Sequence, residues 1–453
     1  MKFNFDIYKL LTEKYTNLIE HSVKTIMPTY YYKRIKYYKL YLQTKKCEIK
    51  AIEYNLLGVY YEQLYSNVSF DKLDINEAIS YFLKAYLLDN NEPIYLKNLI
   101  ICYSIINDYK NAFVYWQILI QKNVLTFDDK FDYACFCWKY KNFEGLHDYY
   151  ISRFYKENNP VPYPNFSKPM WCGQDIKNKH LLIYCEQGFG DTIFIFGYLK
   201  KILNITSQIT FVVQDELYFL IKENINEAKV KIIPKSQAKI NELLFDYHLP
   251  SMSIPNVLRF QKTDYIIKNK YLEANKKLTN KYKKLFSNNK VKIGLSIQGS
   301  NIGNKTRDIL LSNFKILDDY NNIEIYLLTQ NINSTLIEEN FKQIDVHNIG
   351  NTFNNFDETA AAMSNLDCII TSDNVILNLA GALGIKTYAL FNFSYECRWF
   401  DLTGDNVFYY KTVKPFVNDK QNNWQYSINE MLVQLRKDFP LVKNKSQTQN
   451  QIT

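Results

Sequence analysis

The residues with the clearest capacity for chemistry lie in one stretch, residues 180–200, with the sequence HLLIYCEQGFGDTIFIFGYLK. An apolar run at 181–185 has the length of a buried strand, and the apolar segment at 192–199 is long enough for a helix. Gly188 and Gly190 lie between them and predict a strand-to-helix turn. Glycines at such a turn let backbone N–H groups approach a ligand, and the helix N-terminus favours an anion.

Asp191 comes directly after this turn and has two interpretations. Its carboxylate can cap the helix, or it can accept a proton from a substrate hydroxyl at the mouth of the turn. Gln187, Gly188 and Gly190 would line the cleft beside it. The pattern Gly-x-Gly-Asp is not the three-glycine dinucleotide fingerprint, so the sequence gives no support to a nicotinamide or flavin cofactor.

A second stretch, residues 366–391, repeats the construction. An apolar strand at 367–371 is followed by Asp373 and Asn374, and then by a helical segment that contains Gly381. Each residue also has a purely structural interpretation, with Asp373 as a helix cap and Gly381 as a site of close packing. Two turns of this kind, about 180 residues apart, predict two Rossmann-like halves that face a shared cleft.

Composition sets limits on what the protein can be. With 453 residues, 47% of them hydrophobic, the chain is long enough for two to four domains with sizeable cores. The net charge of +9 is spread over interleaved lysines and acidic residues, so no basic arm for nucleic acid is evident. The eight cysteines form no CxxC pair, and the five histidines have no metal-ligand spacing, so we expect no metal and reduced thiols.

The location predicted from the sequence is cytoplasmic, including a peripheral position at the inner membrane face. The N-terminus has acidic residues within its apolar region and no small-residue cleavage site, which argues against a secretory signal. No run approaches the roughly 20 apolar residues that a transmembrane helix needs.

The first third of the chain contains a repeat. Small and aromatic residues recur at a spacing close to the 34 residues of a tetratricopeptide repeat. The recurring positions are Ala78, Phe82 and Ala85, then Ala112, Trp116 and Leu119, then Gly145, Tyr149 and Ser152. Small residues let paired helices approach, and aromatic residues fill the space between neighbouring pairs. Such arrays present a concave face, so a protein partner is expected on the repeats.

The order of segments then gives the expected domains. Residues 1–50 form a helical N-terminal segment, and residues 51–158 form the helical repeats. Four prolines within residues 158–169 end the helical pattern. Beyond them, short strands alternate with helices, which predicts an N-terminal Rossmann-like domain at 159–275 and a C-terminal one at 290–423. An amphipathic closing helix is expected at 424–439 and a disordered polar tail at 440–453.

Five separated blocks of the sequence occur in the order seen in a known family. They are Trp171-x-Gly173, Glu186 to Thr192 (EQGFGDT), Gln298-Gly299 with Arg307-x-Ile309-x-Leu311, Asp373 with Leu379 to Gly384 (LAGALG), and Arg398-Trp399. In this order they resemble tetratricopeptide-linked glycosyltransferases that are similar to the heptosyltransferase family. The resemblance covers about residues 165–435.

The resemblance implies an α + α/β protein in which a tetratricopeptide-like array precedes a GT-B fold. The C-terminal Rossmann-like domain would bind a nucleotide-diphosphate sugar as donor, and the N-terminal one would bind the acceptor. Transfer would invert the anomeric carbon, with Asp191 as catalytic base and no obligatory cofactor. Arg307 would neutralise the departing diphosphate, and the segment that Asp373 and Asn374 open would face it.

The sequence also departs from the family. Ser or Thr commonly follows the Asp, and a His commonly precedes Leu-Ala-Gly-Ala, where this chain has Asn374 and Asn378. Gly197 replaces a frequent Arg. Asn378 carries no charge, although its amide can still donate a hydrogen bond to a phosphate or sugar oxygen.

Two functional hypotheses follow. The first is an inverting glycosyltransferase that acts on a glycan, a lipid-linked or a protein acceptor. The second is a catalytically degenerate protein of the same architecture that serves as a protein-interaction module. The substitutions at residues 374 and 378 motivate the second hypothesis.

Overall fold

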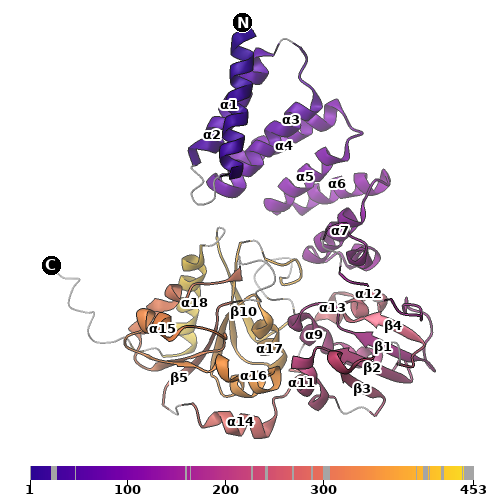
Figure 1. Cartoon of the computed structure of the whole chain (residues 1–453), viewed down its shortest axis with the longest axis vertical. Coiled ribbons are helices and arrows are strands. Elements are labelled where there is room, and N and C mark those ends of the chain that lie inside the picture. The colour runs from indigo at the N-terminus through magenta and orange to yellow at the C-terminus, as the bar shows by residue number, and fades with distance from the viewer. Residues whose placement is uncertain are drawn as a thin grey trace, which may run out of the picture. The chain divides into compact units, whose positions relative to one another are not determined.

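The computed structural model (Figure 1) forms two compact units, Met1–Thr126 and Phe127–Thr453. It describes residues 2–21, 28–45, 47–158, 161–163, 165–225, 228–239, 243–267, 270–286, 289–298, 307–393, 395–400, 407, 409–419, 423–440 and 442. Among these residues, no helix combines the length and the apolar character needed to cross a membrane.

The first unit is helical throughout its regular structure. Its helices are α1 (Lys2–His21), α2 (Pro28–Thr44), α3 (Ala51–Leu64), α4 (Lys72–Leu88), α5 (Pro93–Ile105) and α6 (Tyr109–Gln121), with a short π-helical turn at Tyr65–Ser69. Consecutive helices pack in pairs, α1 with α2, α3 with α4, and α5 with α6. The helical segment predicted at 1–50 is therefore present as α1 and α2.

The repeated small residues lie inside these helix pairs. Ala78 and Ala85 on α4 and Ala112 on α6 are fully buried. A side-chain carbon added at Gly58 on α3 would lie 2.6 Å from the ring of Phe82 on α4. Glycine at this position is thus what allows α3 and α4 to approach. Residues 51–126 are thus mostly helical, while the repeat array and its tetratricopeptide assignment stay predictions.

The second unit begins with a further helix pair and continues into two sheets. Helices α7 (Phe127–Lys139) and α8 (Phe143–Tyr149) pack together, followed by a 3-10 helix, η2 (Tyr150–Phe154). The third set of repeat residues lies here. A side-chain carbon added at Gly145 would lie 2.5 Å from the Cys137 sulfur, so Gly145 packs against this residue.

The first sheet has four parallel strands in the order β3-β2-β1-β4. They are β1 (His180–Tyr184), β2 (Gln208–Val213), β3 (Val230–Pro234) and β4 (Tyr247–Pro250). The helices of this region are α9 (Phe189–Phe196), α10 (Leu199–Ile202), α11 (Tyr218–Glu223), α12 (Ile254–Val257), α13 (Lys262–Tyr265) and α14 (Lys276–Lys283).

The second sheet has six parallel strands in the order β10-β9-β8-β5-β6-β7. They are β5 (Val291–Ser296), β6 (Ile323–Leu327), β7 (Asp345–Asn348), β8 (Cys368–Ser372), β9 (Thr387–Phe391) and β10 (Val413–Val417). The helices are α15 (Ser334–Asn340), α16 (Phe356–Met363), α17 (Val375–Leu383) and the closing helix α18 (Trp424–Asp438), with a 3-10 segment at Leu311–Asp319. Buried side chains of α18 and of these strands form one apolar core.

In both sheets the first strand lies in the middle, and the chain winds first to one side and then to the other. In doubly wound sheets of this kind, ligands bind outside the carboxyl ends of the strands where the winding direction reverses. This point lies between β1 and β4 in the first sheet, and between β5 and β8 in the second. The two turns singled out in the sequence follow β1 and β8, so both lie at such points.

Some details differ from the sequence-based expectation. The helix expected at 192–199 begins earlier, at Phe189, and ends at Phe196. The sequence does not predict strand β10, because Pro415 interrupts its apolar pattern; the strand lies at the sheet edge, where proline is tolerated. The predicted tail at 440–453 lies outside the described residues except for residues 440 and 442.

A buried histidine makes the stability of the second unit depend on pH. His248 on β4 is 2% exposed, and its ring lies 4.6 Å from that of Phe166. Its Nδ1 atom has no hydrogen-bond partner within the described part of the chain. Burial lowers the pKa of His248 to about 4, whereas the ordinary value is about 6.5. Only the unfolded chain therefore takes up this proton between about pH 6.5 and pH 4.

We predict that the free energy of unfolding contributed by His248 is complete above about pH 6.5 and falls as the pH is lowered towards 4. The loss should reach roughly 3 kcal/mol. His248→Gln cannot titrate, so its unfolding free energy, measured by urea denaturation at several pH values, should fall less steeply than that of the wild type. Equal slopes for the two proteins would contradict the prediction.

Candidate active site

The turn after β1 holds the Asp191 carboxylate in a defined position. Gly188 is the N-cap of α9, and Asp191 lies in the first turn of the helix. Its Oδ2 atom accepts a hydrogen bond of 2.9 Å from the Gly188 N–H. The capping interpretation is therefore correct for one oxygen of the carboxylate.

The other carboxylate oxygen of Asp191, Oδ1, faces the half of the second unit that contains the six-stranded sheet. Oδ1 lies 2.5 Å from Nη1 of Arg398, and Nη2 of the same guanidinium lies 3.0 Å from the Glu396 carboxylate. The Arg398 side chain is only 8% exposed and that of Asp191 16%. Burial lowers the pKa of Arg398, but the neighbouring carboxylates, Asp191 first among them, outweigh it and hold the pKa well above its ordinary value.

Asp373 and Arg307 add to the same cluster of charges. The Asp373 carboxylate lies 3.9 Å from Nη1 of Arg307, and the same nitrogen donates to the Asp373 carbonyl oxygen at 3.5 Å. Asp373 is buried, whereas the Arg307 side chain is 44% exposed. Burial raises the pKa of the Asp373 carboxyl, and the charges of Arg307 and Arg398 oppose this. Burial likewise raises the pKa of Glu396 to about 7.

Asn374 serves the local structure. It is the N-cap of α17, and its Oδ1 accepts the Ile376 N–H at 2.8 Å. Its Nδ2 donates to the Ser296 hydroxyl and to the Gln298 carbonyl, both at 3.1 Å. The side chain thus ties the carboxyl end of β5 to the start of α17.

Asn378 lies where α17 meets α9, two helices that pack against each other (Figure 1). A side-chain carbon added at Gly190 would lie 2.7 Å from Nδ2 of Asn378. Oδ1 of Asn378 accepts a hydrogen bond of 3.1 Å from the Tyr410 hydroxyl, which lies 3.2 Å from the Tyr271 hydroxyl. Gly190 therefore makes room for a protein side chain.

Gly381, predicted as a donor-binding residue, also has a packing role. An added carbon there would lie 2.4 Å from the Tyr410 ring, so the glycine admits this ring against α17. Gly384 ends the helix with a positive φ of 72°, which favours glycine. The ligand-binding roles of the sequence-predicted residues stay predictions, and Gly299 lies outside the described residues.

Gln187 contacts the helical segment that precedes the first sheet. Its Nε2 donates to the Tyr150 hydroxyl on η2 at 3.3 Å. The adjacent Glu186 forms a buried ion pair of 2.9 Å with Arg153 of η2, and its second oxygen accepts from Ser251 after β4. Burial raises the pKa of Glu186, and the Arg153 charge opposes this.

The roles of Arg398 and Arg153 are not evident in the sequence. Arg398 is part of a motif block, but the residue has no glycine turn beside it to indicate a site. Arg153 is an arginine at the end of a repeat helix. Only the fold brings them to Asp191 and Glu186. In the described part of the chain, no group of three or more His, Cys, Asp or Glu side chains is arranged to hold a metal ion.

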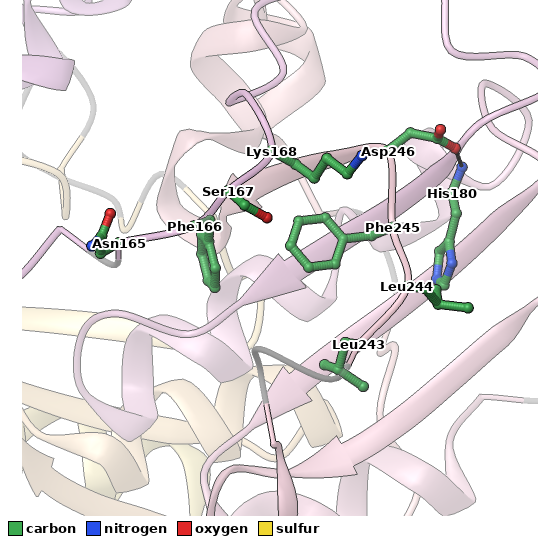
Figure 2. A pocket seen from close by; sticks show the side chains of 9 residues that line it. All are labelled: Asn165, Phe166, Ser167, Lys168, His180, Leu243, Leu244, Phe245 and Asp246. Carbon is green, nitrogen blue, oxygen red and sulfur yellow. Dashed lines mark hydrogen bonds between the residues drawn. The ribbon is translucent and has the colours of Figure 1, made fainter.

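A cavity of about 730 Å³ lies elsewhere on the first sheet (Figure 2). Its lining residues are Asn165, Phe166, Ser167, Lys168, His180, Leu243, Leu244, Phe245 and Asp246. His180 begins β1, and Phe245 and Asp246 precede β4. The cavity is therefore at the amino ends of the strands, away from Asp191 and Arg398 at the carboxyl ends.

No protein-family model matches the chain, and no curated protein matches it. Among solved structures, the glycosyl transferase family 9 from Veillonella parvula is 13% identical, with a TM-score of 0.43, over 59% of this chain and 99% of that one. The E. coli ADP-heptose lps heptosyltransferase II is 12% identical, with a TM-score of 0.38, over 57% of this chain and 99% of that one. A mutant of the Thermobaculum terrenum O-GlcNAc transferase is 7% identical, with a TM-score of 0.28, over 96% of this chain and 92% of that one.

These structures belong to the same classes of protein that the order of the motif blocks resembles. Their TM-scores are all below 0.5.

We predict that Gly190→Ala lowers the free energy of unfolding of the second unit by about 1–3 kcal/mol, because the added methyl group overlaps the buried Asn378 amide. When the amide is already removed by Asn378→Ala, adding Gly190→Ala should cost much less. The double variant Gly190→Ala/Asn378→Ala should therefore be nearly as stable as Asn378→Ala alone. Chemical denaturation measures both effects.

Gly188→Ala is the matched control for this prediction. An added carbon at Gly188 lies 3.3 Å from the nearest atom, Oδ2 of Asp191, so the cost should be smaller. Equal losses at Gly188 and Gly190, or no recovery in the double variant, would show that the steric contact with Asn378 does not set the requirement for glycine.

Proposed function

We propose that the protein is an inverting glycosyltransferase that transfers a sugar from a nucleotide-diphosphate donor to a glycan, lipid-linked or protein acceptor. The observation that carries the proposal is the meeting of the turns after β1 and β8 at one place. Both follow strands at which the winding of their sheet reverses, where α/β folds bind ligands. Asp191 comes from one turn and Asp373 from the other, with Arg398 and Arg307 beside them.

In this proposal the second unit is a GT-B enzyme, with an acceptor domain at 159–275 and a donor domain at 290–423. The donor's diphosphate would lie by the N-terminus of α17, and Gln187, Gly188 and Gly190 would border the acceptor side. Asp373, Asn374, Asn378 and Gly381 would shape the donor side. Asn374 and Gly381 would do so through the backbone and packing they maintain.

The chemical step needs one base to take the acceptor's proton and one cation to stabilise the negative charge of the departing diphosphate. The acceptor oxygen bonds to the anomeric carbon as the bond from that carbon to the diphosphate oxygen breaks. Its proton passes to Asp191, and the electron pair of the broken bond remains on the diphosphate. Arg307, exposed at the edge of the cluster, would stabilise that charge.

The first measurement is isothermal titration of the folded full-length protein with UDP, GDP, ADP and CDP. We expect one of them to bind, and the matching sugar nucleotide to be consumed as a donor. Asp191→Asn should then lower the transfer rate by roughly 10²- to 10⁴-fold, because the amide cannot accept the proton.

Stability is the control for this variant. Asn still offers an oxygen to the Gly188 N–H, but it no longer pairs with the buried Arg398, so a loss of about 1–3 kcal/mol is expected. Rates are therefore compared at a temperature where both proteins are folded, as judged by circular dichroism. Transfer by Asp191→Asn at nearly the wild-type rate would remove Asp191 from the mechanism.

A second candidate is a protein-interaction module that has lost turnover. It is favoured by the hydrogen bonds of Asn374 and Asn378, whose side chains are occupied within the protein. The helices of residues 51–158 would then bind a protein partner, and in either proposal they serve recognition.

Asn378→His distinguishes the two candidates. If the chain is an active transferase, the bulkier imidazole should disturb the contact with Gly190 and lower the rate of donor consumption. Donor consumption that appears only in the Asn378→His variant would favour the degenerate module. The assay is release of the nucleoside diphosphate from a panel of sugar nucleotides.

A further inference from the structure

Arg398 is a buried cation whose partners cannot be inferred from the sequence. Its guanidinium lies between Asp191 of α9, at 2.5 Å, and Glu396, at 3.0 Å. The backbone is fixed as well, because Lys141 donates to the Arg398 carbonyl oxygen at 3.2 Å. The guanidinium carbon lies 5.7 Å from the ring centroids of Phe194 and Trp399. Arg398 thus joins the two halves of the second unit through its ion pair with Asp191.

A buried guanidinium needs an anionic partner, since an uncompensated charge in the interior is strongly unfavourable. Around Arg398 the described charged groups include Asp191, Glu396, Asp373, the second arginine, Arg307, and Lys141 at the Arg398 carbonyl oxygen. Asp373 is close enough for its charge to interact with those of both arginines. The charge of Arg398 therefore interacts with carboxylates from both turns, Asp191 after β1 and Asp373 after β8.

The proposed transfer moves one negative charge across this site. Asp191 becomes neutral when it takes the acceptor's proton, and the diphosphate gains a negative charge when its bond to the sugar breaks. If Arg398 stayed paired with Asp191 and Glu396 alone, it would lose the charge of one of these two partners during the step. A cation shared with the diphosphate would stay compensated throughout.

We propose that Arg398 binds the donor's diphosphate, which displaces the Asp191 carboxylate from it and frees the Asp191 oxygen for the acceptor hydroxyl. This inference rests on the proposed function. In the structure, one Asp191 oxygen accepts a hydrogen bond from the Gly188 N–H, and the other forms the ion pair with Arg398. Donor binding therefore has to precede activation of the acceptor, and the exchange of partners at Arg398 links the two events.

The test uses the full-length protein and the nucleoside diphosphate that the wild type binds best among UDP, GDP, ADP and CDP. Because Asp191 and the diphosphate compete for Arg398, Asp191→Asn should bind this nucleotide about 5- to 10-fold more tightly than the wild type. Arg398→Gln should bind it at least about 10-fold more weakly, and Arg398→Lys should recover part of the loss. The double variant Asp191→Asn/Arg398→Gln should show no gain over Arg398→Gln.

Two comparisons separate this role from a structural one. The nucleoside without phosphates should bind the wild type and the Arg398 variants equally, because it does not reach the guanidinium. Asp148→Asn removes the same charge from an exposed ion pair with Arg259 and should leave diphosphate affinity unchanged. Thermal melts establish that each variant is folded before titration.

The outcomes distinguish the two proposals. If no nucleoside diphosphate binds the folded wild type, both the proposed function and this inference are overturned. If one binds but Asp191→Asn gives no gain, or Arg398→Gln weakens nucleoside and diphosphate alike, the exchange at Arg398 is overturned while the donor site stands.

Discussion

The close packing of α9 against α17 is the constraint on which the candidate site depends. Gly190 has no side chain, and the Asn378 amide occupies the space that a larger residue would fill. The Tyr410 hydroxyl holds that amide in place. Because the helices approach at this point, Asp191 on the first turn of α9 comes within 2.5 Å of Arg398 in the other half. Two turns far apart in the sequence thereby become parts of one site.

Two buried ion pairs fix the surroundings of this contact. Arg153 with Glu186 joins η2 to the carboxyl end of β1, and Arg398 with Asp191 joins the loop after β9 to α9. Taking such charges out of water costs about as much as their attraction returns, so they add little net stability. Breaking either pair is costly, however, because a buried charge then loses a partner. The two ion pairs therefore restrict how η2 lies against β1 and how the loop after β9 lies against α9.

Much of the architecture follows from local patterns in the sequence. Apolar runs predict the strands β1 and β8, and the glycine turn after β1 places Asp191 at the start of a helix, because these signals involve neighbouring residues. The edge strand β10 has no such signal. The roles of Arg153 and Arg398 also escaped prediction, since each depends on a carboxylate that only the tertiary fold brings near. Likewise, the sequence could not tell that Gly381 serves the Tyr410 ring.

Because Asn378 is neutral, it affects how much negative charge Arg398 and Arg307 would have to compensate in the proposed donor site. The Asn378 side chain is 3% exposed and uses its oxygen for Tyr410, so the helix contact keeps its shape without a titratable group. A cationic imidazole there would bring a positive charge against Gly190, next to Asp191. With a neutral amide, the compensation of a diphosphate in the proposed donor site would fall to these two arginines. Of the two, Arg398 is already bound to a carboxylate, so any anion that enters must compete with Asp191 for it.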